Sequence, residues 1–289
     1  MSDKTILSLE GLCAGYGRGD AISDISLSLS TGEALCVVGQ SGCGKSTLLK
    51  SVIGVFDKPV ISGGDIVFDG CRLSELSQKR RCALTTSGMG FIFQTPGAAF
   101  NPIRSYKKQF IETLKSHDKY DAKSFLPSIK DVFSRLGLQD CERILVSCPY
   151  EMSGGMNQRI ALALVMLMQQ KLLLADEPTS ALDAVTRRTV ADELIAMRTD
   201  CGIAQMIVTH DFALASYVAD RIAVMHCGRI VELAPAKELV SSPLHPYTRM
   251  LLEAVPALGG SIPTFSDAPV QSAGKLIEAC AGHFVLSEV

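Results

Sequence analysis

The chain has 289 residues, of which 47% are hydrophobic and 20% are charged, so it can bury a large core and is too apolar for a disordered protein. Its 28 lysines and arginines against 30 aspartates and glutamates give a net charge of −2, which does not favour a nucleic-acid binder. The longest unbroken apolar run, Ile160 to Met168, is far shorter than the roughly 18 residues that cross a bilayer. The first residues also lack the basic and apolar pattern of a signal peptide.

Apolar strand-like runs alternate with helix-like stretches along the chain, which is typical of an α/β sheet. We expect extended segments at 34–39, 65–69, 90–93, 171–176, 203–209 and 221–225, and a hairpin closed by 228–232. We expect helices at 45–54, 130–138, 184–197 and 211–220. The pattern from about residue 101 to 149, which contains the second of these, is helical. From about Leu258 the periodicity is lost, and we expect a loosely structured tail or a small extension.

A glycine-rich segment follows the first of these strands and fits the pattern GxxxxGK[ST]. Glycines in such a loop let backbone N–H groups surround a triphosphate, and the following helix N-terminus stabilises its charge. We expect Lys45 to reach the β- and γ-phosphates and Ser46 to ligate Mg²⁺. The alternative is a glycine-rich turn before an ordinary helix. The candidate nucleotide-binding residues of this loop are Gly39, Ser41, Gly42, Cys43, Gly44, Lys45, Ser46 and Thr47.

A pair of acidic residues ends the apolar strand predicted at 171–176. The carboxyl ends of strands in an α/β sheet are where ligands bind. We therefore expect Asp176 to hold Mg²⁺ through water and Glu177 to polarise the attacking water. An acidic pair that only caps the next element is the alternative.

Between these two motifs, residues 152–159 read Met-Ser-Gly-Gly-Met-Asn-Gln-Arg. With this element, the chain resembles the ATP-binding subunit of an ABC transporter over about residues 5 to 255. Further elements of that family follow in order along the chain. Gln94 resembles the Q-loop glutamine, Asp183 ends a D-loop-like Ser-Ala-Leu-Asp, His210 resembles the switch histidine, and Tyr16 stands where the family places an aromatic ring against adenine.

The resemblance implies a role for each of these elements. Ser153, Gly154 and Gly155 begin a helix whose free N–H groups would bind the γ-phosphate of ATP held by the opposite subunit. Gln94 would contact Mg²⁺ and the attacking water, and His210 would hold the γ-phosphate. Met156 stands where the family usually has glutamine and lacks its amide, but the backbone donors remain, so we expect hydrolysis to survive.

The resemblance also implies the architecture. We expect a P-loop NTPase core with a mostly parallel sheet, an antiparallel β-subdomain and an inserted α-helical subdomain at about residues 100–160. The ATP-binding domain would occupy residues 1–240, and a C-terminal extension residues 241–289.

Two further segments indicate which subfamily of ABC transporters the chain resembles. Residues 96–102 and 245–249 are similar to the dipeptide, oligopeptide and nickel importers. Their sequence is most similar to that of the nickel and metal-chelate branch. This implies an energy-coupling ATPase on the cytoplasmic face of the membrane. Its partners would be a second homologous ATP-binding subunit, two transmembrane permeases and, indirectly, an extracytoplasmic solute-binding protein, with no nucleic acid.

Two other functional classes stay open: a soluble ABC ATPase not coupled to transport, and a nucleotide-gated regulator that does not hydrolyse ATP. The first usually carries a second ATP domain or a long coiled coil, neither of which fits this chain. The second is disfavoured because Lys45, Asp176, Glu177 and His210 are all present.

The ten cysteines include no CxxC pair, and we expect free, buried thiols that serve mainly in packing. Cys43 is the exception, because a helix N-terminus lowers thiol pKa. We therefore expect alkylation of Cys43 to block hydrolysis and Mg-ATP to protect it. The tail holds only Cys280, which does not favour the iron–sulfur cluster of some peptide-type members.

Overall fold

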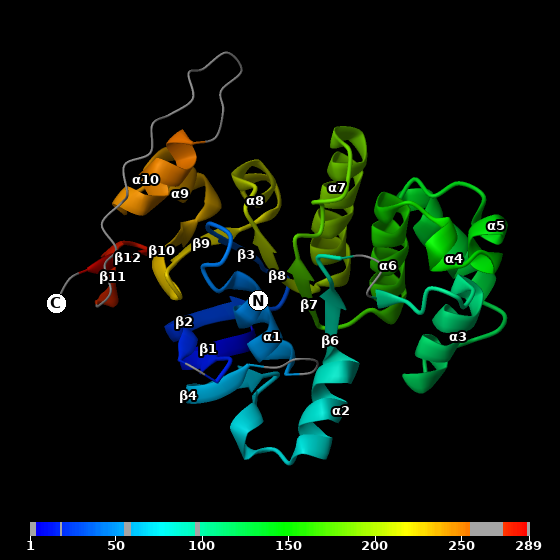
Figure 1. The fold of residues 1–289 in the computed structure, drawn as a ribbon, viewed down its shortest axis with the longest axis horizontal. Coiled ribbons are helices and arrows are strands. Elements are labelled where there is room, and N and C mark those ends of the chain that lie inside the picture. Colours follow the sequence, from blue (N-terminus) through cyan, green and yellow to red (C-terminus); the bar gives the residue numbers. More distant parts are fainter. Residues whose placement is uncertain (1–3, 18, 55–58, 96–98, 255–273, 288–289) are drawn as a thin grey trace.

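A twisted eight-stranded sheet forms the centre of the molecule in a computed structural model that describes residues 4–17, 19–54, 59–95, 99–254 and 274–287 (Figure 1). Its strand order is β11-β12-β10-β9-β3-β8-β7-β6, and the strands from β9 to β6 are parallel. Every residue of β3, β7 and β8 is buried, as expected for parallel strands covered on both faces. The bounds are β3 Ala34–Val38, β6 Met89–Ile92, β7 Leu172–Asp176, β8 Ala204–Thr209, β9 Arg221–His226, β10 Arg229–Pro235, β11 Lys275–Cys280 and β12 His283–Ser287.

A smaller antiparallel sheet of order β2-β1-β4-β5 lies against the first (Figure 1). Its strands are β1 Thr5–Gly15, β2 Asp20–Ser30, β4 Val60–Phe68 and β5 Cys71–Arg72. Helix α1, Lys45–Ile53, packs Leu48, Leu49 and Val52 into a core shared with both sheets. This position fixes the start of α1, and with it the loop that precedes α1, at the carboxyl end of β3.

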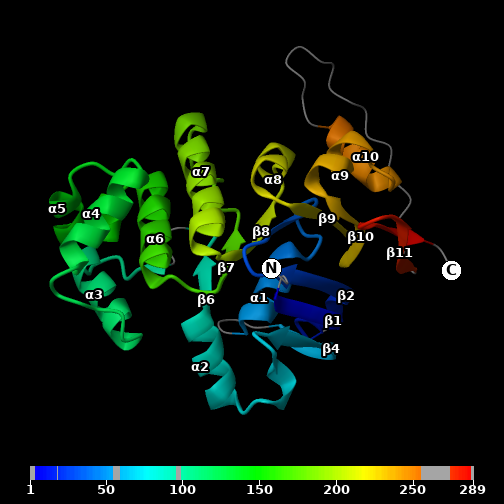
Figure 2. The ribbon, with the colours of Figure 1, turned by 180° about the vertical axis from the view of Figure 1, so that it is seen from behind.

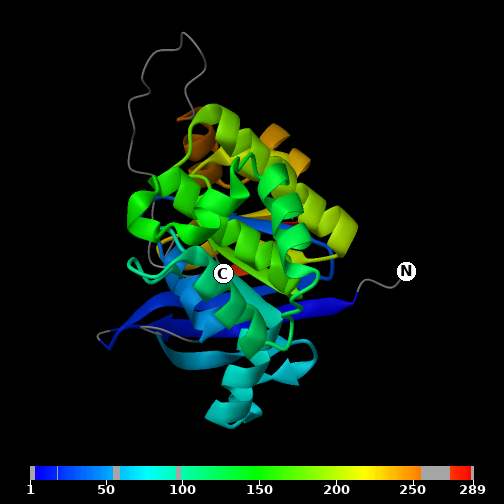
Figure 3. The same cartoon turned by 90° about the vertical axis from the view of Figure 1, so that its right-hand side faces the viewer.

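An inserted group of helices lies at one end of the molecule, as seen from both sides in Figures 1 and 2 and facing the viewer in Figure 3. Its helices are α3 Tyr106–Ser116, α4 Phe125–Arg135, α5 Cys141–Val146 and α6 Gly154–Met168, with a short 3₁₀ turn, η3 Pro149–Glu151. Buried aromatic rings fill its interior. The Phe110 ring stacks at 6.2 Å from Phe100 and meets Phe133 edge-on at 6.3 Å.

The remaining helices cover the sheets. Helices α7 Ala184–Cys201 and α8 Phe212–Val218 pack on one face of the main sheet and belong to the same core as the inserted helices. The elements η1 Leu73–Glu75 and α2 Gln78–Gly88 follow the antiparallel sheet. None of the helices in the described part of the chain is both long enough and apolar enough to cross a membrane.

The chain after β10 forms ordered structure at the opposite end from the inserted helices (Figures 1 and 2). Helices α9 Ala236–Ser241 and α10 Pro246–Glu253 pack there, and the β11–β12 hairpin extends the main sheet by pairing β12 with β10. Of the two alternatives expected for the tail, residues 274–287 form a small extension rather than a loosely structured segment. Residues 258–273 of that tail lie outside the described residues.

The predicted elements from residue 34 to 232 match observed ones, including the β9–β10 hairpin. Strands β1 and β2 were not predicted. Register shifts interrupt β1 at several points, so its apolar residues do not alternate regularly along the sequence.

The expectation of buried cysteines is also only partly correct. All ten are free, but only Cys36 and Cys43 are buried. The exposed cysteines are Cys71, Cys82, Cys201, Cys227 and Cys280.

Candidate nucleotide-binding site

The loop between β3 and α1 has a backbone that only glycine adopts without strain at two positions. Gly42 has φ 84° and Gly44 has φ 108°, both in the left-handed region. A Cβ on Gly44 would lie 2.8 Å from the Ala21 carbonyl oxygen, and one on Gly39 would lie 2.2 Å from the Met225 carbonyl oxygen. These close approaches form a cradle at the N-terminus of α1, where free N–H groups favour an anion.

The Lys45 side chain is folded into this loop. Its Nζ donates hydrogen bonds to the carbonyl oxygens of Gly39, at 2.7 Å, and Gln40, at 2.8 Å. The residue is only 8% exposed. The ammonium is thus held by the dipoles of two neutral carbonyl groups, and it is available to pair with a phosphate.

Asp176 ends β7 beside the start of α1. Burial raises the pKa of its carboxyl, and a hydrogen bond from the Ser46 hydroxyl and the nearby Lys45 charge lower it in part. A hydroxyl and a carboxylate side by side are the hard oxygen ligands that Mg²⁺ prefers.

Glu177 is held by the chain that follows β8. Its Oε1 accepts hydrogen bonds from the His210 backbone N–H, at 3.0 Å, and pairs with His210 Nδ1 at 2.7 Å. Its Oε2 accepts from the Thr209 hydroxyl at 3.2 Å. Glu177 also has φ 50°, an uncommon backbone conformation for a non-glycine residue. Its carboxylate is therefore fixed in direction rather than free to rotate.

These residues share one cavity of about 530 Å³. Its walls bring together five separate parts of the chain: Ala21 on β2, the loop before α1 with the start of α1, Gln94 after β6, the end of β7, and His210 after β8. The set of oxygen ligands and the glycine cradle fit a nucleotide with its magnesium ion. The lining residues are Ala21, Ser41, Gly42, Gly44, Lys45, Ser46, Thr47, Gln94, Asp176, Glu177 and His210.

Another group of predicted residues does not line this cavity. Ser153 and Gly154 are exposed, and Ser153 caps α6 by accepting a hydrogen bond from Met156 N–H at 3.3 Å. Asp183 caps α7 and accepts from Val185 and Thr186, and the bonds from Thr186 lower its pKa. Tyr16 is 52% exposed. This chain therefore presents Ser153, Gly154 and Asp183 to its surroundings rather than to its own cavity.

Helix α6 is nevertheless linked to the catalytic segment within the chain. The buried Gln158 amide donates hydrogen bonds to the carbonyl oxygens of Glu177, at 3.3 Å, and Pro178. Displacement of α6 would therefore act directly on the backbone of Glu177.

The expectation of a lowered pKa at Cys43 is wrong. Burial raises the pKa of its thiol, and the nearby Lys45 charge and hydrogen bonds offset this only in part. Cys43 is 8% exposed and packs beneath Gly39, where a Cβ would lie 2.9 Å from its Sγ. The helix N-terminus is present, but desolvation outweighs its effect on the thiol pKa, and the effect of alkylation on hydrolysis stays a prediction.

Tyr247 is a residue at the site that the sequence did not single out. Its ring is almost fully buried, lies 3.9 Å from the His226 ring, and its hydroxyl accepts a hydrogen bond from the Gln40 backbone N–H at 3.2 Å. The only signal in the sequence was the family-like segment 245–249, which carried no geometry. The related segment at Pro96–Ala98 lies outside the described residues.

Two family profiles match this chain: the ABC transporter profile over residues 22–180, and the C-terminal region of oligopeptide/dipeptide transporters over residues 231–280. The chain is 35% identical to the metal-staphylopine import system ATP-binding protein CntD of Staphylococcus aureus, over 80% of this chain and 85% of the relative. It is 34% identical to the oligopeptide transport ATP-binding protein OppD of Lactococcus lactis, over 86% and 76%. It is 32% identical to the dipeptide transport ATP-binding protein DppD of Bacillus subtilis, over 88% and 77%.

Solved structures of ATP-binding cassettes share the fold of this chain. The ATP-binding cassette MJ0796, in a dimeric post-hydrolysis state bound to ADP and phosphate, is 25% identical and superposes with a TM-score of 0.71 over 80% of this chain and 99% of its own. The cbiO1 protein of Clostridium perfringens, part of the transporter complex cbiONQ, is 26% identical, with a TM-score of 0.70 over 83% and 92%.

Proposed function

Because this chain belongs to the ATP-binding subunits of ABC transporters, whose reaction is the hydrolysis of ATP, we propose that it powers the import of metal chelates or short peptides. The observation that carries the proposal is the joint presence of the eleven-residue phosphate cavity and an importer-type C-terminal region in one chain. The relatives named for import of a metal chelate, of oligopeptides and of dipeptides are similarly identical to this chain, so both solute classes belong to the proposal.

In this proposal each residue of the cavity has one task. Lys45 and the N–H groups of the loop bind the phosphates, and Ser46, Asp176 and Gln94 hold the magnesium ion. The ion, when bound, neutralises charge on the phosphates. Glu177 accepts a proton from the attacking water, and the His210 ring, which is 70% exposed, is free to turn its Nε2 toward the γ-phosphate while Nδ1 stays on Glu177.

We assign Ser153, Gly154, Gly155 and Asp183 to the site of a second, homologous subunit in a head-to-tail pair. All four lie outside this chain's cavity, and Ser153, Gly154 and Asp183 are exposed, which supports the assignment, as does the dimer formed by the MJ0796 cassette. We assign Tyr16 to the adenine of the chain's own nucleotide, because it follows β1 at the rim of the smaller sheet and is exposed.

An exposed apolar patch supports docking to a membrane permease. Ile103 is 77% exposed, and Val146 and Tyr150 are each 70% exposed. Their segments lie side by side, because Tyr150 N–H donates to the Pro102 carbonyl oxygen and Tyr106 N–H to that of Ser147. Large apolar side chains grouped in this way commonly mark an interaction site. We assign the patch to docking on the two transmembrane permeases. In this proposal the chain lies on the cytoplasmic face of the membrane, and a solute-binding protein acts on the other side.

We also assign residues 1–240 to the ATP-binding domain, with the helical subdomain at about 100–160, and residues 241–289 to the C-terminal extension.

A comparison of Glu177→Gln with Glu142→Gln tests the catalytic assignment. Glutamine keeps an oxygen for the His210 donors but cannot take a proton, so we expect ATP binding to persist and turnover to fall by about 10²- to 10⁴-fold. Glu142 is exposed and pairs with Lys130 away from the cavity, so its variant should match the wild type. Turnover by Glu177→Gln equal to that of the wild type would refute the assigned role.

Reconstitution of the chain with its permeases and a homologous ATPase in proteoliposomes tests the transport assignment. ATP-driven uptake of a nickel chelate identifies the metal branch, and uptake of a di- or oligopeptide identifies the peptide branch. Ile103→Asp should abolish co-isolation with permeases without lowering the basal ATPase. If the active chain binds no permease, the transport proposal is wrong and the soluble ATPase replaces it.

A further inference from the structure

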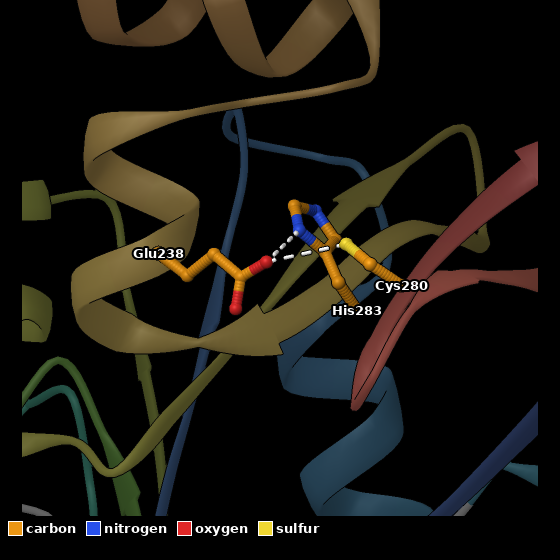
Figure 4. A group of neighbouring side chains, drawn as sticks. All are labelled: Glu238, Cys280 and His283. Carbon is orange, nitrogen blue, oxygen red and sulfur yellow. Dashed lines mark hydrogen bonds and ion pairs between the residues drawn. The ribbon is translucent and has the colours of Figure 1, made fainter.

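A histidine, a cysteine and a glutamate meet where the β11–β12 hairpin packs on α9 (Figure 4). Glu238 lies on α9, Cys280 ends β11, and His283 begins β12. One ligand atom from each lies within 4.8 Å of the other two. The Cys280 thiol donates to Glu238 Oε1 at 3.3 Å, and His283 Nδ1 is 3.1 Å from the same oxygen.

The imidazole of His283 is fixed from its other side. Its side chain is 1% exposed, and its Nε2 lies 2.7 Å from Oε1 of Glu232, a fully buried residue of β10. Glu232 is itself held in place, because its two oxygens accept the backbone N–H groups of Leu244 and His245. When Nε2–H donates to Glu232, Nδ1 is left with a lone pair that faces Glu238 and Cys280.

This is the arrangement of a metal-ligating histidine, in which a carboxylate holds the ring nitrogen that does not bind the ion. Three possible ligand atoms, a nitrogen, a sulfur and a carboxylate oxygen, then converge from β12, β11 and α9.

We propose that Glu238, Cys280 and His283 form a binding site for one zinc ion. Nitrogen, thiolate and carboxylate are the ligand types that Zn²⁺ takes, and three protein ligands leave a fourth position for water. Cys280 is exposed and the Glu238 side chain is 37% exposed, so the ion reaches the site from solvent. Mg²⁺ does not compete, because it prefers oxygen ligands and retains its water. None of the three residues lines the nucleotide cavity.

Zinc at this position would tie the β11–β12 hairpin to α9. Without it, the hairpin is attached through the short β10–β12 pairing, the hydrogen bonds of His283 and Cys280, and the packing of Leu276 and Leu286 on the core. The inference does not rest on the proposed function, since zinc binding is measured without ATP or permeases.

The test measures zinc bound by the full chain in equilibrium dialysis against zinc chloride, in the presence of excess Mg²⁺. We expect one ion per chain, and a loss of affinity in Cys280→Ser and in His283→Asn at least as large as the 10- to 100-fold caused by altering outer-shell partners. Cobalt substitution should give a thiolate-to-metal charge-transfer band in the wild type and no such band in Cys280→Ser.

Two controls are matched to the site. Cys227→Ser removes an exposed thiol whose Sγ lies 3.5 Å from His226 Nε2, so it tests another Cys–His pair. Cys201→Ser removes an exposed thiol at the end of α7. Both should bind zinc as the wild type does.

Because His283 is buried, its variant can also lose stability, and the exposed Cys280 therefore decides the outcome. Zinc binding that Cys280→Ser does not weaken would overturn the proposal. Equal loss in Cys227→Ser would assign the zinc to the other pair, and no binding above background would also overturn the proposal.

Discussion

Replacing His210 with alanine should stop turnover while leaving the fold intact. The ring is 70% exposed, and its Nδ1 is paired with Glu177 Oε1 at 2.7 Å. The His210 backbone N–H donates to the same oxygen at 3.0 Å and survives the substitution. Glu177 therefore keeps a donor that positions it, and the variant removes only the ring.

The two expected effects differ greatly in size. Exposed pairs contribute about 0–1 kcal/mol to stability, and about 1 kcal/mol shifts the unfolding temperature of a chain of this size by only about 2–4 °C. Removing one donor to charge that develops in the transition state costs about 10²- to 10³-fold in turnover, or about 2.7–4 kcal/mol. The increase in activation free energy should thus be several times larger than the decrease in the free energy of unfolding.

The assay is steady-state ATP hydrolysis at saturating Mg-ATP, paired with a thermal unfolding curve for each variant. His117→Ala is the matched control, because the His117 ring pairs with the carbonyl oxygens of Thr113 and Thr86 and does not line the cavity. A His210→Ala variant whose turnover stays within about threefold of the wild type, a change of under 1 kcal/mol, would refute the role of the ring. A fall in unfolding temperature as large as that of a core truncation would show a structural role instead.

Four other substitutions have defined outcomes. Asp176→Asn should abolish Mg-dependent hydrolysis yet raise the unfolding temperature at neutral pH, because burial raises the pKa of this carboxyl and its ionised form destabilises the fold. That gain should shrink as the pH falls through the raised pKa toward the ordinary value of 3.8, where the wild type carries the proton in both states. Phe110→Ala should cost about 3–5 kcal/mol in chemical unfolding, because the ring is fully buried between Phe100 and Phe133. Gly44→Ala should abolish binding of a fluorescent ATP analogue, because φ 108° and a 2.8 Å approach to Ala21 displace the loop. Tyr247→Phe should raise the KM for ATP by about threefold to tenfold with little change in kcat, since it removes the acceptor of the Gln40 N–H.

Each of these outcomes can fail in a recognisable way. A less stable Asp176→Asn would mean that the carboxylate's hydrogen bond outweighs its burial. Normal analogue binding by Gly44→Ala would show that the loop relaxes around a Cβ. An unchanged KM in Tyr247→Phe would separate the C-terminal region from the phosphate loop, and retained stability in Phe110→Ala would show that the inserted helices collapse to fill the cavity.

The nucleotide site was predictable because its chemistry is contiguous in sequence. The residues from Gly39 to Thr47 form one loop, and Asp176 and Glu177 end one strand, so spacing alone gives their relation to the backbone. The link between Glu177 and the segment after β8 was not predictable, because Thr209 and His210 reach it only through the pairing of β7 with β8. The low pKa expected for Cys43 failed for a related reason, since burial depends on the packing of residues far away in the chain.

The C-terminal elements were hardest to predict. The β11–β12 hairpin is short and exposed on β11, so it has no apolar alternation, and its order comes from pairing with β10. The only local signal for the zinc site is the spacing of Cys280 and His283, which places them on either side of a tight turn. Glu238 precedes them by more than 40 residues, and no sequence pattern connects it to them.

A continuous set of contacts nevertheless joins this extension to the phosphate loop. Glu232 binds His283 on one side and the N–H groups that begin the α10 turn on the other, and α10 carries Tyr247 to the backbone of Gln40. Each contact is buried or partly buried, so movement of one element leaves polar groups of the next without partners, at a cost of about 1–3 kcal/mol each. The extension is therefore placed to restrain the loop that binds phosphate, and a zinc ion on His283 would act on the first contact of the series. Coupling between the two sites requires that Tyr247→Phe and Cys280→Ser change ATP binding non-additively when combined, because independent sites would simply add.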